Sequence, residues 1–212
     1  MNQKQSFKHY SVVMALFAVL LVLSNTVATK LCLFGPFVWT SAIVLFPIVY
    51  ILGDVVTEVY GFAGAKRIFY VGLAGNALMS VVYAATSLFP ALDPEFGVMY
   101  TTVLGQVPRL VVASLLGLWA GQFSNAYIMS CLKQIHSGRH LWFRTISSTL
   151  VGESLDTAIF AVVAFYGQVP AQVIWMMIYS GTAFKAIYEA AITPVTYVVI
   201  NWFKKEEESY AS

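Results

Sequence analysis

Seven ionisable side chains interrupt the long apolar stretches of this chain, and side chains of this kind can bind polar solutes inside a membrane. They are Asp54, Glu58, Arg109, Glu153, Asp156, Lys185 and Glu189. A charged side chain at the centre of a bilayer costs about 2.5–3.5 kcal/mol on insertion scales, unless it faces the bundle interior and finds partners. We therefore expect these side chains to face a polar cavity between helices.

The spacing of these residues places them on a few helix faces. Three pairs lie three or four residues apart and so share a face of their helix: Asp54 with Glu58, Glu153 with Asp156, and Lys185 with Glu189. The charges could simply neutralise one another and tie helices together. Five acids oppose two bases, however, so the excess favours ligand binding over a purely structural role. Asp156 and Lys185 are the foremost candidates because their positions are the most central.

The elements that carry these residues are long apolar segments. Hydrophobic residues make up 59% of the 212-residue chain and charged residues 10%, and the mean hydropathy is +0.75. A spanning helix needs roughly 20 apolar residues, and six segments meet this need, at about 10–30, 38–60, 67–89, 106–131, 146–167 and 172–202. We predict an all-α integral membrane protein, a single domain over residues 1–212 with six transmembrane helices.

Positive charge fixes the expected orientation. All but three of the Lys and Arg residues fall in alternate loops and at the two termini, which predicts that both termini are cytoplasmic. Topology thus accounts for the net charge of +2 without a nucleic-acid partner. We expect the terminal KKEEE run, 204–208, to be a solvated tail. The longest outer connection, FPALDPEFG at 89–97, is the candidate lid or entrance.

Two further features concern the packing of the helices and the shape of the cavity. GLWAG at 117–121 is a G-x-x-x-G match that lets helices approach closely; it predicts packing within the chain, with an oligomer face as the alternative. Aromatic residues at the depth of the charges could line a flat slot, and the candidates are Phe46, Trp119, Phe160 and Tyr188.

Motifs for enzymatic chemistry are absent from the sequence. It contains no H-E-x-x-H, no G-x-S-x-G and no G-x-x-x-x-G-K-[ST], and its three His residues lie at or beyond the predicted cytoplasmic boundary. Cys32 and Cys131 are predicted to lie a bilayer thickness apart, beyond disulfide reach. We therefore predict no catalytic residue, metal or cofactor, and transport is favoured over an intramembrane enzyme or a scaffold subunit.

The chemistry of such a cavity suits a planar heterocycle. Carboxylates accept hydrogen bonds, amides and cations donate them, and aromatic faces stack on flat rings. A guanine-like base offers adjacent N–H donors and a carbonyl acceptor. The residues permit this class of ligand without selecting one member.

A set of short motifs resembles the queuosine precursor transporter family, a branch of the vitamin uptake transporters, over nearly the whole chain. The motifs that carry the resemblance are Ser24-Asn25, DVVTEVYG at 54–61, Arg109, Gly121-Gln122, STLVGESLDT at 148–157, and Phe184-Lys185 with Glu189. Their order on six helices makes the set specific, although no single motif would be.

This resemblance implies uptake of 7-cyano-7-deazaguanine or 7-aminomethyl-7-deazaguanine across a bacterial inner membrane, by a multi-pass protein, for tRNA modification. It also implies a fold similar to the substrate-binding subunits of energy-coupling-factor vitamin importers. The substrate-binding residues implied are Asn25, Asp54, Arg109, Gln122, Glu153, Asp156, Lys185 and Glu189.

The driving force and the assembly stay open. An uncoupled carrier, a proton symporter and a subunit energised by a partner ATPase all fit the sequence. The first helix lacks an Ala-x-x-x-Ala docking repeat, which favours action without an ATPase. A homodimer is one alternative, and a vitamin- or purine-binding importer subunit is another. The expected partners are a small-molecule substrate and the lipid bilayer.

Overall fold

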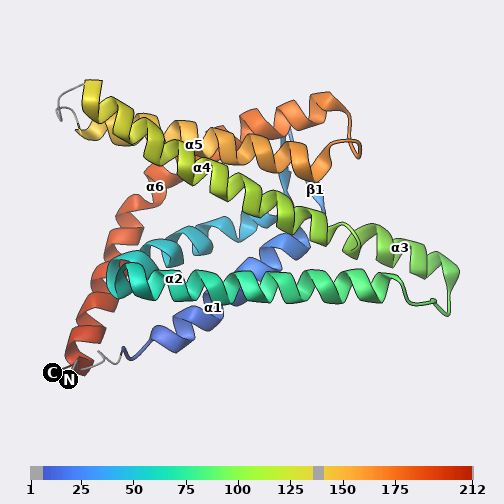
Figure 1. Cartoon of the computed structure of the whole chain (residues 1–212), viewed down its shortest axis with the longest axis horizontal. Helices are drawn as coiled ribbons and strands as arrows, with labels where there is room; N and C mark the ends of the chain where they lie inside the picture. Colours follow the sequence, from blue (N-terminus) through green and yellow to red (C-terminus); the bar gives the residue numbers. More distant parts are fainter. Residues whose placement is uncertain (1–6, 136–140, 212) are drawn as a thin grey trace.

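The computed structural model describes residues 7–135 and 141–211, which form a bundle of helices with one short β-hairpin (Figure 1). The helices are α1 (Tyr10–Val27), α2 (Phe46–Ser87), α3 (Pro94–Leu104), α4 (Val107–Ile135), α5 (Leu141–Phe165) and α6 (Ala171–Ala211). Five helical stretches in the described ranges are long and apolar enough to cross a membrane. The prediction of a multi-pass, mainly helical membrane protein is thus confirmed. The predicted turn at HSGR lies outside the described residues.

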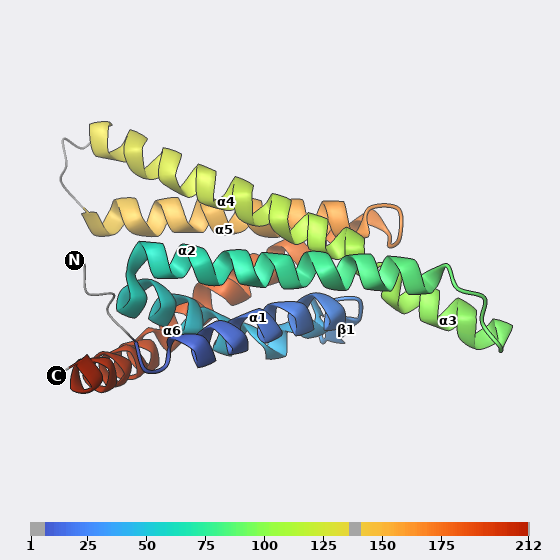
Figure 2. The same cartoon turned by 60° about the horizontal axis from the view of Figure 1, so that its bottom comes forward.

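Helix α2 contains two of the predicted spans. Its backbone leaves the helical conformation at Gly61, where φ is 67° and ψ is −179°. Glycine adopts such a positive φ without a Cβ penalty. Figures 1 and 2 both show the part before Gly61 turning back beside the part after it. Buried Val55 and Val56 from the first part and Ile68 from the second pack with Phe17 of α1. The predicted turn at GFAG is therefore present.

A β-hairpin that the sequence analysis did not predict precedes α2 in this otherwise helical fold. Strands β1 (Leu31–Phe34) and β2 (Phe37–Thr40) pair in antiparallel register, and a 3-10 turn, η1 (Ser41–Val44), follows. The loop between the strands is Gly35-Pro36, with φ of 60° at Gly35. A glycine with positive φ at the first of two loop positions is typical of tight hairpins. The predicted start of the second span at residue 38 was therefore wrong, because residues 37–44 belong to β2 and η1.

Helices α4 and α5 run side by side, as Figures 1 and 2 both show. Glycines set their separation. A Cβ added at Gly121 would lie 2.9 Å from the carbonyl oxygen of Gly152, and one added at Gly152 would lie 2.8 Å from that of Gly121. Contacts this short leave no room for any side chain. The G-x-x-x-G match thus packs helices within the chain, as predicted.

The end of the chain is helical and anchored, so the prediction of a solvated KKEEE tail was wrong. Glu207 is only 6% exposed. Its carboxylate accepts hydrogen bonds from the backbone N–H groups of Lys8 and His9, at 2.6 and 2.8 Å, and from the Tyr60 hydroxyl at 3.3 Å. His9 is the N-cap residue of α1, and the N-terminus of a helix favours negative charge. Glu207 therefore caps the N-terminus of α1 from the far end of the sequence.

Candidate functional site

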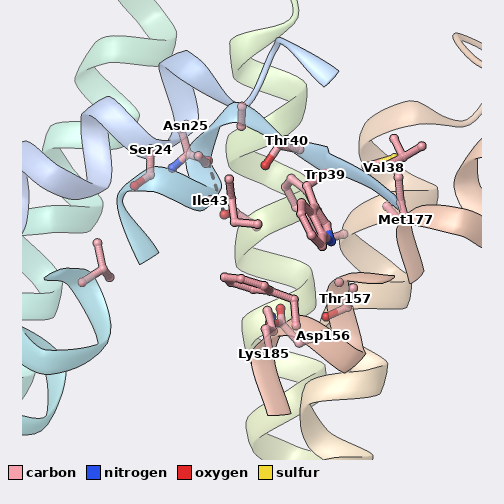
Figure 3. A pocket seen from close by; sticks show the side chains of 18 of the residues that line it. Ser24, Asn25, Val38, Trp39, Thr40, Ile43, Asp156, Thr157, Met177 and Lys185 are labelled. Carbon is pink, nitrogen blue, oxygen red and sulfur yellow. Dashed lines mark hydrogen bonds and ion pairs between the residues drawn. The ribbon is translucent and has the colours of Figure 1, made fainter. Parts of the chain in front are cut away.

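A cavity of about 200 Å³, called here the central cavity, lies among α1, the hairpin, α4, α5 and α6 (Figure 3). Most of its wall is apolar. The polar side chains of the wall come from five elements and are Ser24, Asn25, Thr40, Ser114, Asp156, Thr157 and Lys185. An apolar pocket with a few convergent polar groups is the usual form of a small-molecule site.

One ion-pair cluster forms part of this wall. The Lys185 ammonium on α6 lies 2.5 Å from Asp156 Oδ2 and 3.0 Å from Glu153 Oε2, both on α5. The side chain of Lys185 is only 13% exposed. The spacing-based expectation that charges from different helices converge is confirmed for these three residues. Because two carboxylates share one ammonium, the cluster carries an excess of one negative charge when all three groups are ionised.

A glycine of α4 makes room for this cluster. A Cβ at Gly117 would lie 2.6 Å from Asp156 Oδ1 and 2.8 Å from the Asp156 carbonyl oxygen. Any larger residue at this position would displace the carboxylate or separate the two helices. Gly117 therefore allows Asp156 to sit between α4 and α6 beside the cavity.

Asn25 lines the cavity and ties three helices together. Its amide group donates to Asn76 Oδ1 on α2 at 2.8 Å, and its Oδ1 atom accepts from the Ser114 hydroxyl of α4 at 3.3 Å. Asn76 is 5% exposed and donates in turn to the Gly72 carbonyl at 3.0 Å. Buried amides need such partners, so Asn25 holds α1 against α2 and α4 at the edge of the site.

Aromatic rings form one side of the cavity. Trp39 of β2 stacks on Phe37 with a centroid distance of 5.5 Å and an interplanar angle of 3°, and its ring centroid lies 5.3 Å from that of Phe184. Phe160, a predicted slot residue, also lines the cavity. Trp119 does not, since it is 70% exposed on the surface of α4. Sequence reasoning missed Trp39, because its segment was assigned to a transmembrane helix.

Three polar atoms of the wall are buried without a hydrogen-bond partner among the described residues. They are the hydroxyl oxygens of Ser24 and Thr157 and the indole nitrogen Nε1 of Trp39. Such a group costs about 1–3 kcal/mol when it stays unpaired. These atoms are therefore the polar groups of the wall that the described residues leave unsatisfied, whereas Asp156 and Lys185 are paired with each other.

Arg109 is placed outside the central cavity. Its Nε and Nη2 atoms donate to the carbonyl oxygens of Val163 and Tyr166, each at 2.6 Å. These carbonyls belong to the C-terminal end of α5, where helix carbonyls lack intrahelical partners and favour a cation. Arg109 therefore caps the C-terminal end of α5, which accounts for an arginine in an apolar helix.

Gln122 and Glu153 lie on the far side of Asp156, in a pocket of about 30 Å³ between α4 and α5. Asp156 lines both this pocket and the central cavity. The Oδ1 atom of Asn125, another residue of the small pocket, is buried without a partner within the described ranges. A pocket of this size holds about one water molecule.

Asp54 lies in a third pocket, of about 410 Å³, between the first part of α2 and α6. Glu58 lies there too and pairs with Lys204 at 3.1 Å, with 60% and 43% of the two side chains exposed. Glu189 is exposed on α6, one turn beyond Lys185. The predicted residues are thus divided among several places, and Asn25, Asp156 and Lys185 are the ones that line the central cavity.

Residues 88–104, which include the predicted lid, do not line the cavity. Figure 1 shows α3 at the far end of the bundle, whereas β2 of the hairpin forms part of the cavity wall. No group of three or more His, Cys, Asp or Glu residues arranged to hold a metal ion occurs in the part of the chain that the structure describes.

Comparison with known proteins assigns the family. The family model described as "Putative vitamin uptake transporter" matches residues 40–199. A Bacillus subtilis (strain 168) protein named "Probable queuosine precursor transporter" is 33% identical over 141 residues, which is 66% of this chain and 61% of that protein. An Escherichia coli (strain K12) protein named "Queuosine precursor transporter" is 29% identical over 122 residues, 57% of this chain and 52% of that protein.

The chain thus matches less than two thirds of the length of either relative. No solved structure matches it significantly. The family match covers most of the chain, and it agrees with the apolar helices and the polar cavity between them. The chain belongs to the family described as putative vitamin uptake transporters.

Proposed function

We propose that this protein takes up a queuosine precursor, 7-cyano-7-deazaguanine or 7-aminomethyl-7-deazaguanine, across a bacterial inner membrane for tRNA modification. The names of the two relatives support this substrate class. The observation that carries the proposal is the central cavity, where the rings of Trp39, Phe160 and Phe184 meet the Asp156–Lys185 pair. Aromatic rings can stack on a flat base, while the polar groups form hydrogen bonds with the donors and acceptors along its edge.

We further propose six spanning segments with both termini cytoplasmic. The two parts of α2 that meet at Gly61 would each span the membrane, with Lys66 and Arg67 on the cytoplasmic side. The hairpin and the central cavity then lie toward the outer face, and the Asp54 pocket lies toward the cytoplasm.

Direct binding to the purified full chain tests the substrate class. We expect isothermal titration calorimetry to detect binding of 7-cyano-7-deazaguanine and much weaker binding of guanine, riboflavin and biotin. Asp156→Asn should weaken this binding, whereas Glu95→Gln, on the exposed surface of α3, should not. Tight binding of riboflavin or biotin in place of the deazaguanine would instead favour a vitamin-binding importer subunit.

Proton coupling is a second proposal, which the sharing of Lys185 by two carboxylates favours. A proton on one of the acids would neutralise the excess negative charge of the cluster. Uptake into membrane vesicles should then fall when the pH gradient is collapsed with an ionophore. Uptake that is indifferent to the gradient would refute coupling and leave the substrate proposal intact.

A further inference from the structure

Two of the unpartnered donors in the central cavity belong to different elements and face the same space. Trp39 is on β2, and Thr157 is on α5 directly after Asp156. Neither the indole nitrogen nor the hydroxyl has a hydrogen-bond partner among the residues that the structure describes, and Thr157 is only 8% exposed. In Figure 3 the indole nitrogen lies on the side of the ring that faces Thr157.

The chemistry of these two groups restricts what can fill the space between them. An indole N–H donates and cannot accept, and a threonine hydroxyl can donate as well. A ligand atom that satisfies both groups must therefore be an acceptor, such as a carbonyl oxygen. An amino group at this point would leave the indole N–H facing another donor, at a cost of about 1–3 kcal/mol for each group left unpaired.

Asp156 supplies the complementary acceptor beside them. Lys185 bonds Oδ2 of this carboxylate, and a carboxylate has about four lone-pair sites. A ring N–H next to the carbonyl can therefore donate to Asp156 without displacing Lys185. A carbonyl beside an N–H in one ring is the lactam edge of a cyclic amide.

We propose that Trp39 and Thr157 are specificity-determining residues that bind the carbonyl oxygen of a lactam edge, while Asp156 accepts the neighbouring ring N–H. The inference rests on the proposed function, since 7-deazaguanines carry such an edge. It goes beyond that function in two ways: it assigns the residues that recognise the lactam edge, and it names cyclic amides as the substrate class.

A matched pair of ligands and two conservative variants test the inference on the purified full chain. The ligands are 7-cyano-7-deazaguanine and the analogue in which an amino group replaces its ring carbonyl. Trp39→Phe keeps the ring and removes the N–H, and Thr157→Val keeps the shape and removes the hydroxyl. The control variants are Trp175→Phe, at a position that is 57% exposed, and Thr182→Val, which removes another buried unpartnered hydroxyl that does not line the cavity.

We expect the wild-type protein to prefer the carbonyl ligand about 10–100-fold, because the amino analogue mispairs two groups. Its amino group faces the indole N–H of Trp39, and its neighbouring ring nitrogen, which carries no hydrogen, faces the Asp156 carboxylate. Each variant should lower affinity for the carbonyl ligand about tenfold and change affinity for the amino analogue much less, so that the preference shrinks. Thr157→Ser, which restores a hydroxyl, should recover the preference, and both controls should keep it. If the two residues had only a structural role, the variants would lose the same factor of affinity for both ligands.

Several outcomes would overturn the inference. If the wild-type protein binds 7-cyano-7-deazaguanine but binds the amino analogue equally well, the lactam assignment is wrong, and this result needs no variant to fold. If Thr157→Val and Trp39→Phe keep the wild-type preference, the two residues do not select the carbonyl. Both results leave the proposed function standing. A wild-type protein that binds neither ligand would overturn the function and the inference together.

Discussion

Removing the Lys185 ammonium should both destabilise the protein and abolish uptake. In Lys185→Met the carboxylates of Asp156 and Glu153, which lie 2.5 and 3.0 Å from the ammonium, would face each other with no cation between them. Breaking a buried ion pair costs about 3–5 kcal/mol. Since the side chains of Glu153 and Asp156 remain 29% and 26% exposed, water offsets part of this cost. We expect a loss of about 2–4 kcal/mol.

The corresponding loss in melting temperature is roughly 5–15 °C for a chain of this size. Asp156→Asn leaves Lys185 its contact with Glu153 at 3.0 Å. This variant should therefore melt within about 4 °C of the wild type, at a cost of about 1 kcal/mol, although it too should lose uptake. Thermal unfolding in detergent and uptake of labelled 7-cyano-7-deazaguanine, measured on the same preparations, separate the two effects.

Lys204→Met is the matched control for stability. Lys204 also makes an ion pair, with Glu58 at 3.1 Å, but both side chains are largely exposed. Exposed pairs contribute little, so this variant should melt like the wild type. The reasoning fails if Lys185→Met melts no lower than Lys204→Met. If Lys185→Met and Asp156→Asn both keep wild-type uptake, the cluster is a scaffold and has no part in transport.

Three further predictions follow from contacts elsewhere in the fold. Gly152→Ala should lower the melting temperature by several degrees because its Cβ would meet the Gly121 carbonyl at 2.8 Å, whereas Gly53→Ala, with nothing within 4 Å, should not. Glu207→Gln should lower the free energy of unfolding by about 1–2 kcal/mol and make the C-terminus more sensitive to carboxypeptidase. The control is Glu208→Gln, at an exposed position, which should be digested like the wild type. Equal digestion of both variants would contradict the capping role. Asn76→Leu should destabilise the protein by about 1–3 kcal/mol, measured by thermal unfolding, because it removes the buried oxygen that accepts from the Asn25 amide at 2.8 Å and leaves that amide only the Leu21 carbonyl at 3.2 Å.

Spacing along the sequence predicted the ion-pair cluster because two of its three residues are close neighbours on one helix. Glu153 and Asp156 lie three residues apart on one helix, so a single cation on a neighbouring helix can reach both. The predicted role of the G-x-x-x-G glycines was correct for the same reason. A row of small residues brings the facing backbone close, whichever helix provides it.

Composition could not distinguish the hairpin from a membrane helix. The segment LCLFGPFVWT, 31–40, is as apolar as the helices beside it, and only its Gly-Pro pair signals a turn. Trp39 was missed along with the hairpin. The solvated tail was wrongly predicted for a different reason: Glu207 caps a helix distant in the sequence, and no pattern in one chain reveals such a partner. The contact of Arg109 with the end of α5 could not be foreseen either, for the same reason.

The division of polar groups in the central cavity suits the uptake proposed above, because a carrier has to return empty after releasing its substrate. A buried charge without a partner would cost several kcal/mol in the empty state, but Lys185 satisfies Asp156 within the protein. The groups left open, Trp39 Nε1 and the hydroxyls of Ser24 and Thr157, are neutral and cost about 1–3 kcal/mol each when unpaired. Neutral donors can therefore select a ligand by the geometry of its hydrogen bonds without leaving an unpaired charge in the empty cavity.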